Sequence, residues 1–161
     1  MSRTLKRRRK EGKTDYRLRL NLLKSGKPRL VIRKSNQYML AQIIESEGAQ
    51  DKVLYGLTSK ALLSKGWPVD LSGSLKSIQA SYLTGLMLGN VAKSKVKFAV
   101  LDIGLYRNIE KSRIYALLKG ILDAGISIPH SEEILPSLEE ISKKGKGGEV
   151  FTKVKQKIQN G

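Results

Sequence analysis

The residues with the clearest chemistry are the arginines and lysines that crowd the start of the chain. Residues 1–34 contain 14 Lys or Arg but only two carboxylates, Glu11 and Asp15, which gives this stretch a net charge of +12. The whole chain of 161 residues has a net charge of +17, so everything after residue 34 adds only +5. An arginine side chain can hold a phosphate through two parallel hydrogen bonds. This concentration of cations therefore predicts a polyanionic partner, with nucleic acid as the favoured candidate.

Other uses of the basic stretch remain open. The densest run, residues 7–10, is also compatible with a solvated tail, a localisation signal or a patch that binds a membrane surface. A lipid anchor is disfavoured, because Met1-Ser2 lacks the glycine needed for myristoylation and the chain has no cysteine. The apolar runs are short and interrupted by charges, so we expect no membrane-spanning segment and no secretory signal.

Groups for nucleophilic or metal chemistry are scarce. The absence of cysteine excludes disulfides, thiolate metal sites and cysteine nucleophiles. His130 is the only histidine, which excludes histidine-rich metal sites and most catalytic triads, and we expect it to be structural. The glycines show neither a phosphate-binding loop nor a dinucleotide-binding pattern. No cofactor, no metal and no small-molecule substrate is expected.

One carboxylate suggests a catalytic alternative. Asp102 begins an Asp-Ile-Gly pattern after an apolar run, similar to the metal-binding aspartate of ribonuclease-H-like nucleases and actin-like ATPases. Two-metal chemistry needs several converging carboxylates, for which Glu110 and Asp123 are the candidates. A metal-dependent nuclease using Asp102 is kept as the alternative function. The competing interpretation is a structural aspartate that binds loop amides or pairs with Arg107 or Arg113.

The first third of the chain predicts a helix followed by three strands. The helix covers residues 16–24, with Thr14 or Asp15 as its cap and Gly26 just beyond its end. Short loops between the strands indicate an antiparallel meander. The strands are expected at residues 30–34, 38–45 and 53–57.

The rest of the chain predicts helices around one further strand. The apolar run 97–102 is expected to be a central strand, and Gly85 and Gly89 indicate close approach of a helix to the sheet. Ser137 and Glu140 have the spacing of a capping box, and residues 145–148 resemble a flexible joint. The helices are expected at residues 58–63, from Ser72 or Ser74 to 93, at 113–124, from Ser137, and at 150–158.

These elements, in the order βββααβα, define an α/β fold. We expect a two-layer mixed sheet, a three-strand antiparallel meander plus the central strand, with helices packed on it. The predicted division is a basic N-terminal arm (residues 1–13), an α/β RNA-binding domain (14–130) and a C-terminal helical or flexible tail (131–161). The role of residues 143–161 stays open.

Several blocks of the sequence resemble one known family. The longest is LKSGKPRLVIRKSN at residues 23–36, preceded by Thr14-Asp15-Tyr16; further blocks lie at 82–85, 99–105, 122–125 and 128–130. Over residues 7–140 the chain strongly resembles the large-subunit ribosomal protein eighteen family, which binds 5S rRNA, in its archaeal form. The loop after Asp102 departs from the Arg-Gly-Gly-Tyr loop of bacterial members, since it reads Ile103-Gly104-Leu105-Tyr106-Arg107 here.

The resemblance implies a non-enzymatic, cytoplasmic component of the large ribosomal subunit. It implies a place in the central protuberance between 5S rRNA and 23S rRNA, beside proteins such as ribosomal protein five. A ribosome-free RNA chaperone is a further possibility. The candidate RNA-binding residues are cations, turn residues and tyrosines able to stack on bases. They are Arg7, Arg8, Arg9, Lys10, Lys13, Tyr16, Arg17, Arg19, Lys24, Lys27, Arg29, Arg33, Lys34, Ser35, Asn36, Tyr106, Arg107 and Arg113; Tyr38 is a further possible stacking platform.

Overall fold

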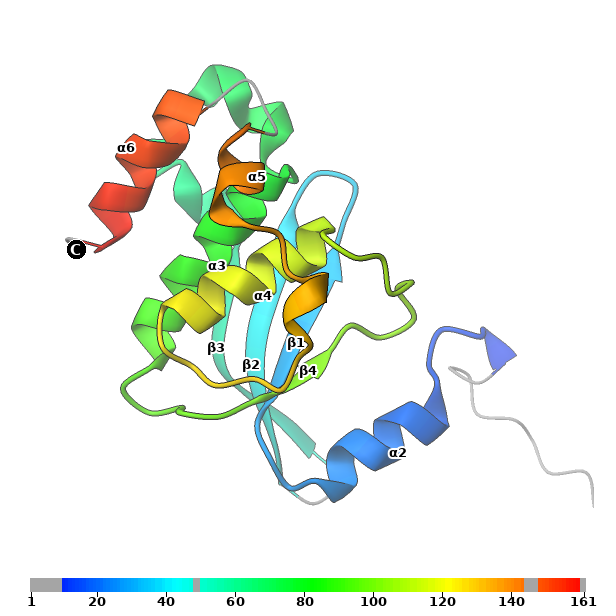
Figure 1. Ribbon diagram of the computed structural model, residues 1–161. Helices are drawn as coiled ribbons and strands as arrows, with labels where there is room; N and C mark the ends of the chain where they lie inside the picture. The colour runs from blue at the N-terminus through cyan, green and yellow to red at the C-terminus, as the bar shows by residue number, and fades with distance from the viewer. Residues whose placement is uncertain (1–9, 48–49, 144–147, 160–161) are drawn as a thin grey trace, which may run out of the picture.

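The computed structural model describes residues 10–47, 50–143 and 148–159. The strands are β1 Arg29–Lys34, β2 Met39–Glu47, β3 Gln50–Thr58 and β4 Val100–Asp102. The α-helices are α2 Tyr16–Lys24, α3 Ile78–Ala92, α4 Arg113–Asp123, α5 Leu138–Lys143 and α6 Gly148–Gln159, and short 3-10 helices lie at Ser59–Leu62, Val69–Ser74 and Glu132–Ile134. Within this described part, the strands form one four-stranded sheet in the order β3-β2-β1-β4. Helices α3 and α4 cover one face of the sheet, while α2 stands apart near its lower end (Figure 1).

Alternation along β1 separates apolar from charged side chains. Leu30 and Ile32 are fully buried in the core, whereas Arg29 and Arg33, one residue out of phase, belong to the opposite face. β1 pairs in parallel with β4, and Asp102 lies opposite Val31 in that register, on the same face as the two arginines. The strand pairing therefore brings two cations and a carboxylate together on the face away from α3 and α4.

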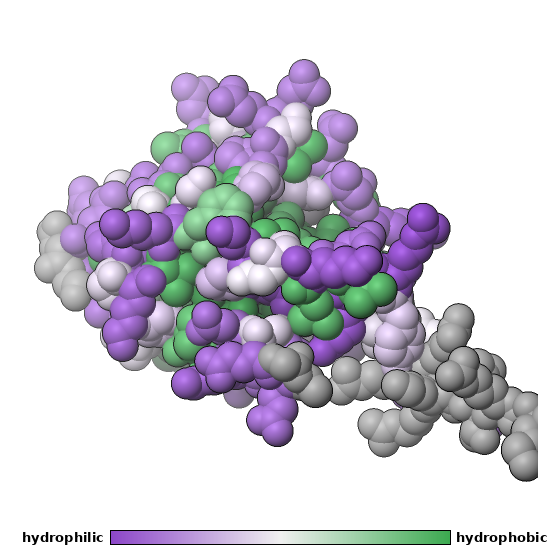
Figure 2. Space-filling model, turned by 90° about the horizontal axis from the view of Figure 1, so that it is seen from below, coloured by the Kyte–Doolittle hydropathy of each residue, from purple (hydrophilic) through white to green (hydrophobic). Residues whose placement is uncertain are grey.

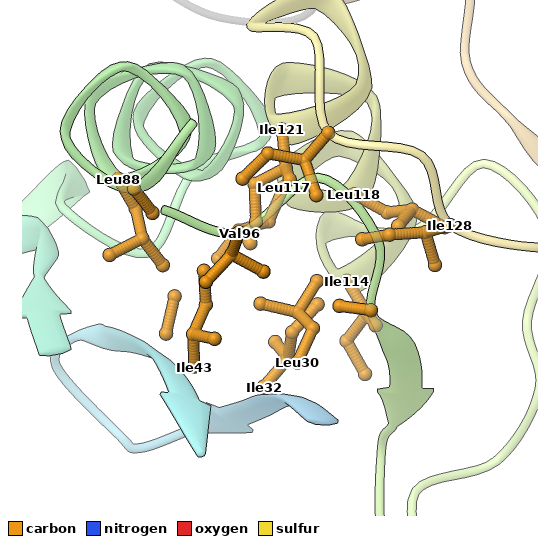
Figure 3. Packing of buried hydrophobic residues seen from close by; sticks show 14 of the residues in the cluster. Leu30, Ile32, Ile43, Leu88, Val96, Ile114, Leu117, Leu118, Ile121 and Ile128 are labelled. Atoms are coloured by element: carbon orange, nitrogen blue, oxygen red, sulfur yellow. The ribbon is translucent and has the colours of Figure 1, made fainter. Parts of the chain in front are cut away.

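The core lies between the sheet and the two central helices. Figure 3 shows Leu30, Ile32 and Ile43 from the strands pointing toward Ile114 and Leu117 of α4. A second apolar cluster lies on the other side of α3 and includes side chains of α6. Its α6 members are Phe151, Val154 and Ile158, each at most 5% exposed. The stretch after residue 148 is thus a helix that packs on the body.

The predicted meander and the α/β class are confirmed. β1 and β2 pair antiparallel, as do β2 and β3. β2 continues to Glu47 and β3 begins at Gln50, so both extend further than the sequence indicated. The prediction of a central fourth strand is wrong, because β4 lies at the sheet edge and covers only Val100–Asp102. The preceding residues pair instead with the 126–128 segment through a bridge between Phe98 and Ser127. The apolar run 97–102 is therefore divided: its first part pairs with the 126–128 segment, and its last part, β4, pairs with β1.

The helices also differ in detail from the prediction. α3 is capped by Ser77, whose Oγ accepts a hydrogen bond from the amide of Ala80, whereas Ser72 and Ser74 lie in a separate 3-10 helix. Two expected caps are present: the Asp15 carboxylate accepts from the first-turn amides of α2, and Ser137 forms its capping box with Glu140.

The glycines of α3 serve helix packing rather than the predicted contact with the sheet. A Cβ on Gly85 would lie 2.1 Å from the carbonyl oxygen of Leu117 in α4. A Cβ on Gly120 of α4 would lie equally close, at 2.1 Å, to the carbonyl oxygen of Tyr82 in α3. The two backbones therefore touch, which holds α4 and the loop before it at a fixed place over the sheet.

Candidate nucleic-acid interface

A chain of ion pairs runs across the sheet face that α3 and α4 leave uncovered. Arg29, only 2% exposed, donates from Nη1 to Asp102 Oδ2 at 3.0 Å and from Nη2 to Asp51 Oδ1 at 2.8 Å. Arg33 donates to Asp102 Oδ1 at 2.9 Å, and Arg19 of α2 donates to Asp51 Oδ2 at 3.0 Å. We call these five residues the arginine–carboxylate network. It connects α2, β1, β3 and β4 through side chains alone.

Asp51 is the member that connects α2 to the sheet. Partial burial opposes its ionisation, but hydrogen bonds from Ser46, Arg19 and Arg29 outweigh that effect and lower the pKa of the Asp51 carboxyl to about 2. The Ser46 hydroxyl donates to the same carboxylate at 2.6 Å. α2 has no buried residue of its own, so these polar contacts matter for its position.

The interpretation of Asp102 as a structural aspartate that binds loop amides or pairs with an arginine is confirmed, although the arginines are not the predicted ones. Its carboxylate accepts from the Gly104 amide at 3.0 Å, as expected for a loop-binding aspartate, and pairs with Arg29 and Arg33 rather than Arg107 or Arg113. Within the described ranges, no group of three or more His, Cys, Asp or Glu could hold a metal ion. Asp123 lies elsewhere, accepting from the Tyr82 hydroxyl and pairing with Lys119. Asp102 therefore has a structural role.

The loop after β4 is held against the end of β1. The Tyr106 hydroxyl donates to the Lys34 carbonyl at 2.6 Å and accepts from the Lys34 amide at 3.1 Å. Tyr106 thus fixes the loop through its hydroxyl while its ring lines a hollow beside Arg107 and Arg113. The sequence could not show this pairing, because the two residues are 72 positions apart.

The candidate RNA-binding residues fall into two neighbouring groups. The first lines a hollow of about 230 Å³ between α2 and the loop after β4, and includes Lys13, Arg19 and Arg33. The second lines a hollow of about 490 Å³ and includes Lys34 and the Tyr106–Arg107 pair. Arg33 and Lys34 are successive residues of β1, so their side chains point to opposite faces of the sheet, and the two hollows lie on either side of the end of β1. Figure 2 shows mostly hydrophilic side chains on the side seen from below, with apolar side chains between them.

The exposure of the candidates differs widely. The exposed ones are Lys10, Lys13, Tyr16, Arg17, Lys24, Lys27, Lys34, Ser35, Asn36 and Arg107. Arg19, Arg33, Tyr106 and Arg113 are half-buried, and Arg29 is buried between two carboxylates. The predictions for Arg7, Arg8 and Arg9 lie outside the described residues. Ser35 also closes its own turn, because its Oγ accepts from the Tyr38 amide at 2.8 Å.

Of the two carboxylates of the network, sequence reasoning missed Asp51. Asp51 sits in a polar stretch whose composition is typical of a loop, and only its place in β3, opposite Ser46 of β2, brings it to Arg29. Lys60 was also missed: its Nζ lies 4.4 Å from the centre of the Tyr38 ring, which was considered only as a stacking platform for bases. The β-register was the signal that could have found Asp51, since it alone sets which side chains face Arg29.

Comparison with known proteins agrees with this structure. A family model described as "Ribosomal large subunit proteins 60S L5, and 50S L18" matches residues 2–99 and 92–131. The chain is 49% identical over 136 residues to the large ribosomal subunit protein uL18 of Korarchaeum cryptofilum, covering 84% of this chain and 68% of that protein. It is 47% identical to uL18 of Aeropyrum pernix and 48% identical to that of Methanococcus maripaludis, of which it covers 62% and 69%. It therefore spans about two thirds of the length of these relatives.

The fold, the basic surface and these matches define a ribosomal protein of the large subunit, not an enzyme. The chain belongs to the family of ribosomal large subunit proteins that includes uL18. Membership implies rRNA binding and a location on cytoplasmic ribosomes. In the part of the chain that the structure describes, no helix has the length and apolar character to cross a membrane.

Proposed function

We propose that this protein is a structural constituent of the large subunit that binds 5S rRNA and helps attach it to 23S rRNA in the central protuberance. The observation that carries the proposal is the pair of basic hollows on either side of the end of β1, one lined by Arg33 and the other by Lys34. Folded RNA is recognised mainly by its shape, phosphates and exposed bases, and a track of cations on a rigid sheet edge suits such a partner. Ribosomal protein five is the proposed protein neighbour.

The exposed cations of the track and the arm would make the direct contacts. Arg17 and Lys24 extend the track along α2, and Arg107 extends it past the end of β1. Arg29 has a supporting role in this proposal, because both ends of its guanidinium are already held by carboxylates. A buried Arg29 keeps Asp102 and Asp51 in place, and those carboxylates orient Arg33 and Arg19 toward the ligand.

Filter binding of labelled 5S rRNA across a salt series tests the proposal. If six to ten phosphates are neutralised, affinity should fall by roughly 10³- to 10⁵-fold between about 50 and 200 mM salt. An immobilised 23S rRNA should retain labelled 5S rRNA only when the protein is added. No binding of 5S rRNA, or a flat salt dependence, would contradict the proposal.

We also propose the division into a basic N-terminal arm (1–13), an RNA-binding domain (14–130) and a C-terminal tail (131–161). The described residues of the arm, 10–13, are all exposed, whereas α6 of the tail buries three side chains in the second cluster. Deleting residues 1–13 should weaken RNA binding and leave cooperative thermal unfolding intact. Loss of cooperative unfolding in that truncation would refute the division.

A further inference from the structure

The second hollow, which Lys34, Tyr106 and Arg107 line, differs from the rest of the basic surface because much of its lining is apolar. It has a volume of about 490 Å³. Its apolar lining comes from Ile78 at the start of α3, from Ile114 of α4, from Ile109 and from the Tyr106 ring. Ile109 is 59% exposed although it is a large aliphatic residue. We call this feature the loop hollow.

Cations surround this apolar floor. Lys34, Arg107 and Arg113 line the loop hollow, and within the described residues none of the three forms an ion pair. This contrasts with Arg29 and Arg33, whose guanidinium groups are already held by carboxylates. Glu110 lies in the same loop but is not part of the lining. The charges at the loop hollow are therefore available for an external anion.

A polar atom in the wall also lacks a partner. Ser112 occupies the cap position of α4, yet its side chain accepts no capping hydrogen bond. Its Oγ is buried and has no hydrogen-bond partner among the described residues. A buried hydroxyl without a partner costs free energy, which a ligand that supplies a donor or acceptor can recover.

The loop that forms the wall is held firmly at both ends. At one end Tyr106 bonds both backbone groups of Lys34. At the other end Lys111, with a positive φ of 53°, donates its amide to the Ile134 carbonyl at 2.9 Å and its Nζ to Glu140 at 2.7 Å. The loop hollow is therefore preformed, which lowers the entropic cost of filling it.

We propose that the loop hollow binds a single unpaired RNA base, with the neighbouring phosphate held by its three free cations. The proposal rests on the proposed function and adds to it a site for a nucleotide taken out of its stack. A base has flat apolar faces, polar edges and an attached phosphate, and these match the isoleucine walls, the Ser112 hydroxyl and the cations. An anionic peptide would satisfy the cations, but it would make fewer contacts with the apolar floor and with the Ser112 hydroxyl.

Two matched substitutions test this site in the full chain. Ile109→Asp places a carboxylate in the loop hollow, while Val69→Asp makes the same charge change at an apolar residue that is 76% exposed and lies outside it. Both positions are exposed, so both variants should keep the wild-type melting temperature. We expect Ile109→Asp to weaken 5S or 23S rRNA binding by roughly tenfold or more, and Val69→Asp to change it less than about threefold.

Chemical probing of the bound RNA supplies the second measurement. With wild-type protein, one or two unpaired nucleotides should be protected at their base edges, and Ile109→Asp should restore their reactivity while the remaining footprint persists. Equal effects of the two variants, or an unchanged footprint with Ile109→Asp, would overturn the proposal. Loss of a protein neighbour with no change in RNA binding would show a peptide occupant instead. Failure of the wild-type chain to bind either RNA would contradict the proposed function itself.

Discussion

Replacing Asp102 with asparagine tests the arginine–carboxylate network most directly. Asp102 is 7% exposed and accepts hydrogen bonds from Arg29, Arg33 and the Gly104 amide. Asparagine has nearly the same shape, but it is neutral, and its amide nitrogen must point a donor at one of the two guanidinium groups. The substitution therefore removes charge compensation without creating a cavity.

The expected loss follows from the burial of the partners. Breaking a buried ion pair by removing one charge costs about 3–5 kcal/mol. Arg29 retains Asp51, and Arg33, whose side chain is 38% exposed, can turn toward water, so the lower end applies. A loss of about 3 kcal/mol in the free energy of unfolding corresponds to a fall of roughly 6–12 °C in Tm for a chain of this size.

Urea unfolding and thermal melts of the purified chain measure this loss. Asp70→Asn, at an exposed aspartate in a 3-10 helix, is the matched control, and we expect it to change stability by less than about 0.5 kcal/mol. RNA affinity measured below the melting transition should also fall, although the substitution removes a negative charge from a basic face. If Asp102→Asn matches the control in stability and binds RNA more tightly, the network has no positioning role.

Three further expectations concern other contacts. Wild type should be more stable than Asp51→Asn above about pH 4, and this advantage should vanish as the pH falls toward 2, because the Asp51 carboxylate, whose pKa is lowered in the fold, stabilises it only while ionised. A pH series of urea unfolding curves for both proteins measures the difference. Gly85→Ala should cost about 3 kcal/mol in urea unfolding, because its Cβ would lie 2.1 Å from the Leu117 carbonyl oxygen, and a loss below 1 kcal/mol would contradict that packing. Phe151→Ala should cost about 3–5 kcal/mol if α6 is part of the cooperative unit, and a separate early melting transition would show that it is not.

Local signals in the sequence predicted the local structure well. The Asp15 cap, the Gly26 stop with its φ of 61° and the Ser137–Glu140 box each involve residues a few positions apart, so the chain reveals them without tertiary information. The start of α3 was missed, since several nearby serines offer the same capping chemistry. Ser77 is the one of these serines that caps α3, and tertiary packing decides between them.

The parts that depend on distant residues were predicted less completely. Strand alternation places Arg29 and Arg33 on one face, but it cannot show that Asp102, 73 positions after Arg29, lies between them. The same limit hid the contact between Arg29 and Asp51. The edge position of β4 was missed because an apolar run shows that residues are covered, but it does not show which segments cover them.

The arginine–carboxylate network also changes what a salt titration would count. Arg19, Arg29 and Arg33 already have Asp51 and Asp102 as permanent counterions, supplied by the protein itself. An arginine neutralised in this way displaces fewer ions from the RNA atmosphere than a free one. The number of ions released on assembly should therefore be smaller than the number of basic residues at the surface, and it should report mainly on the residues that lack an internal carboxylate.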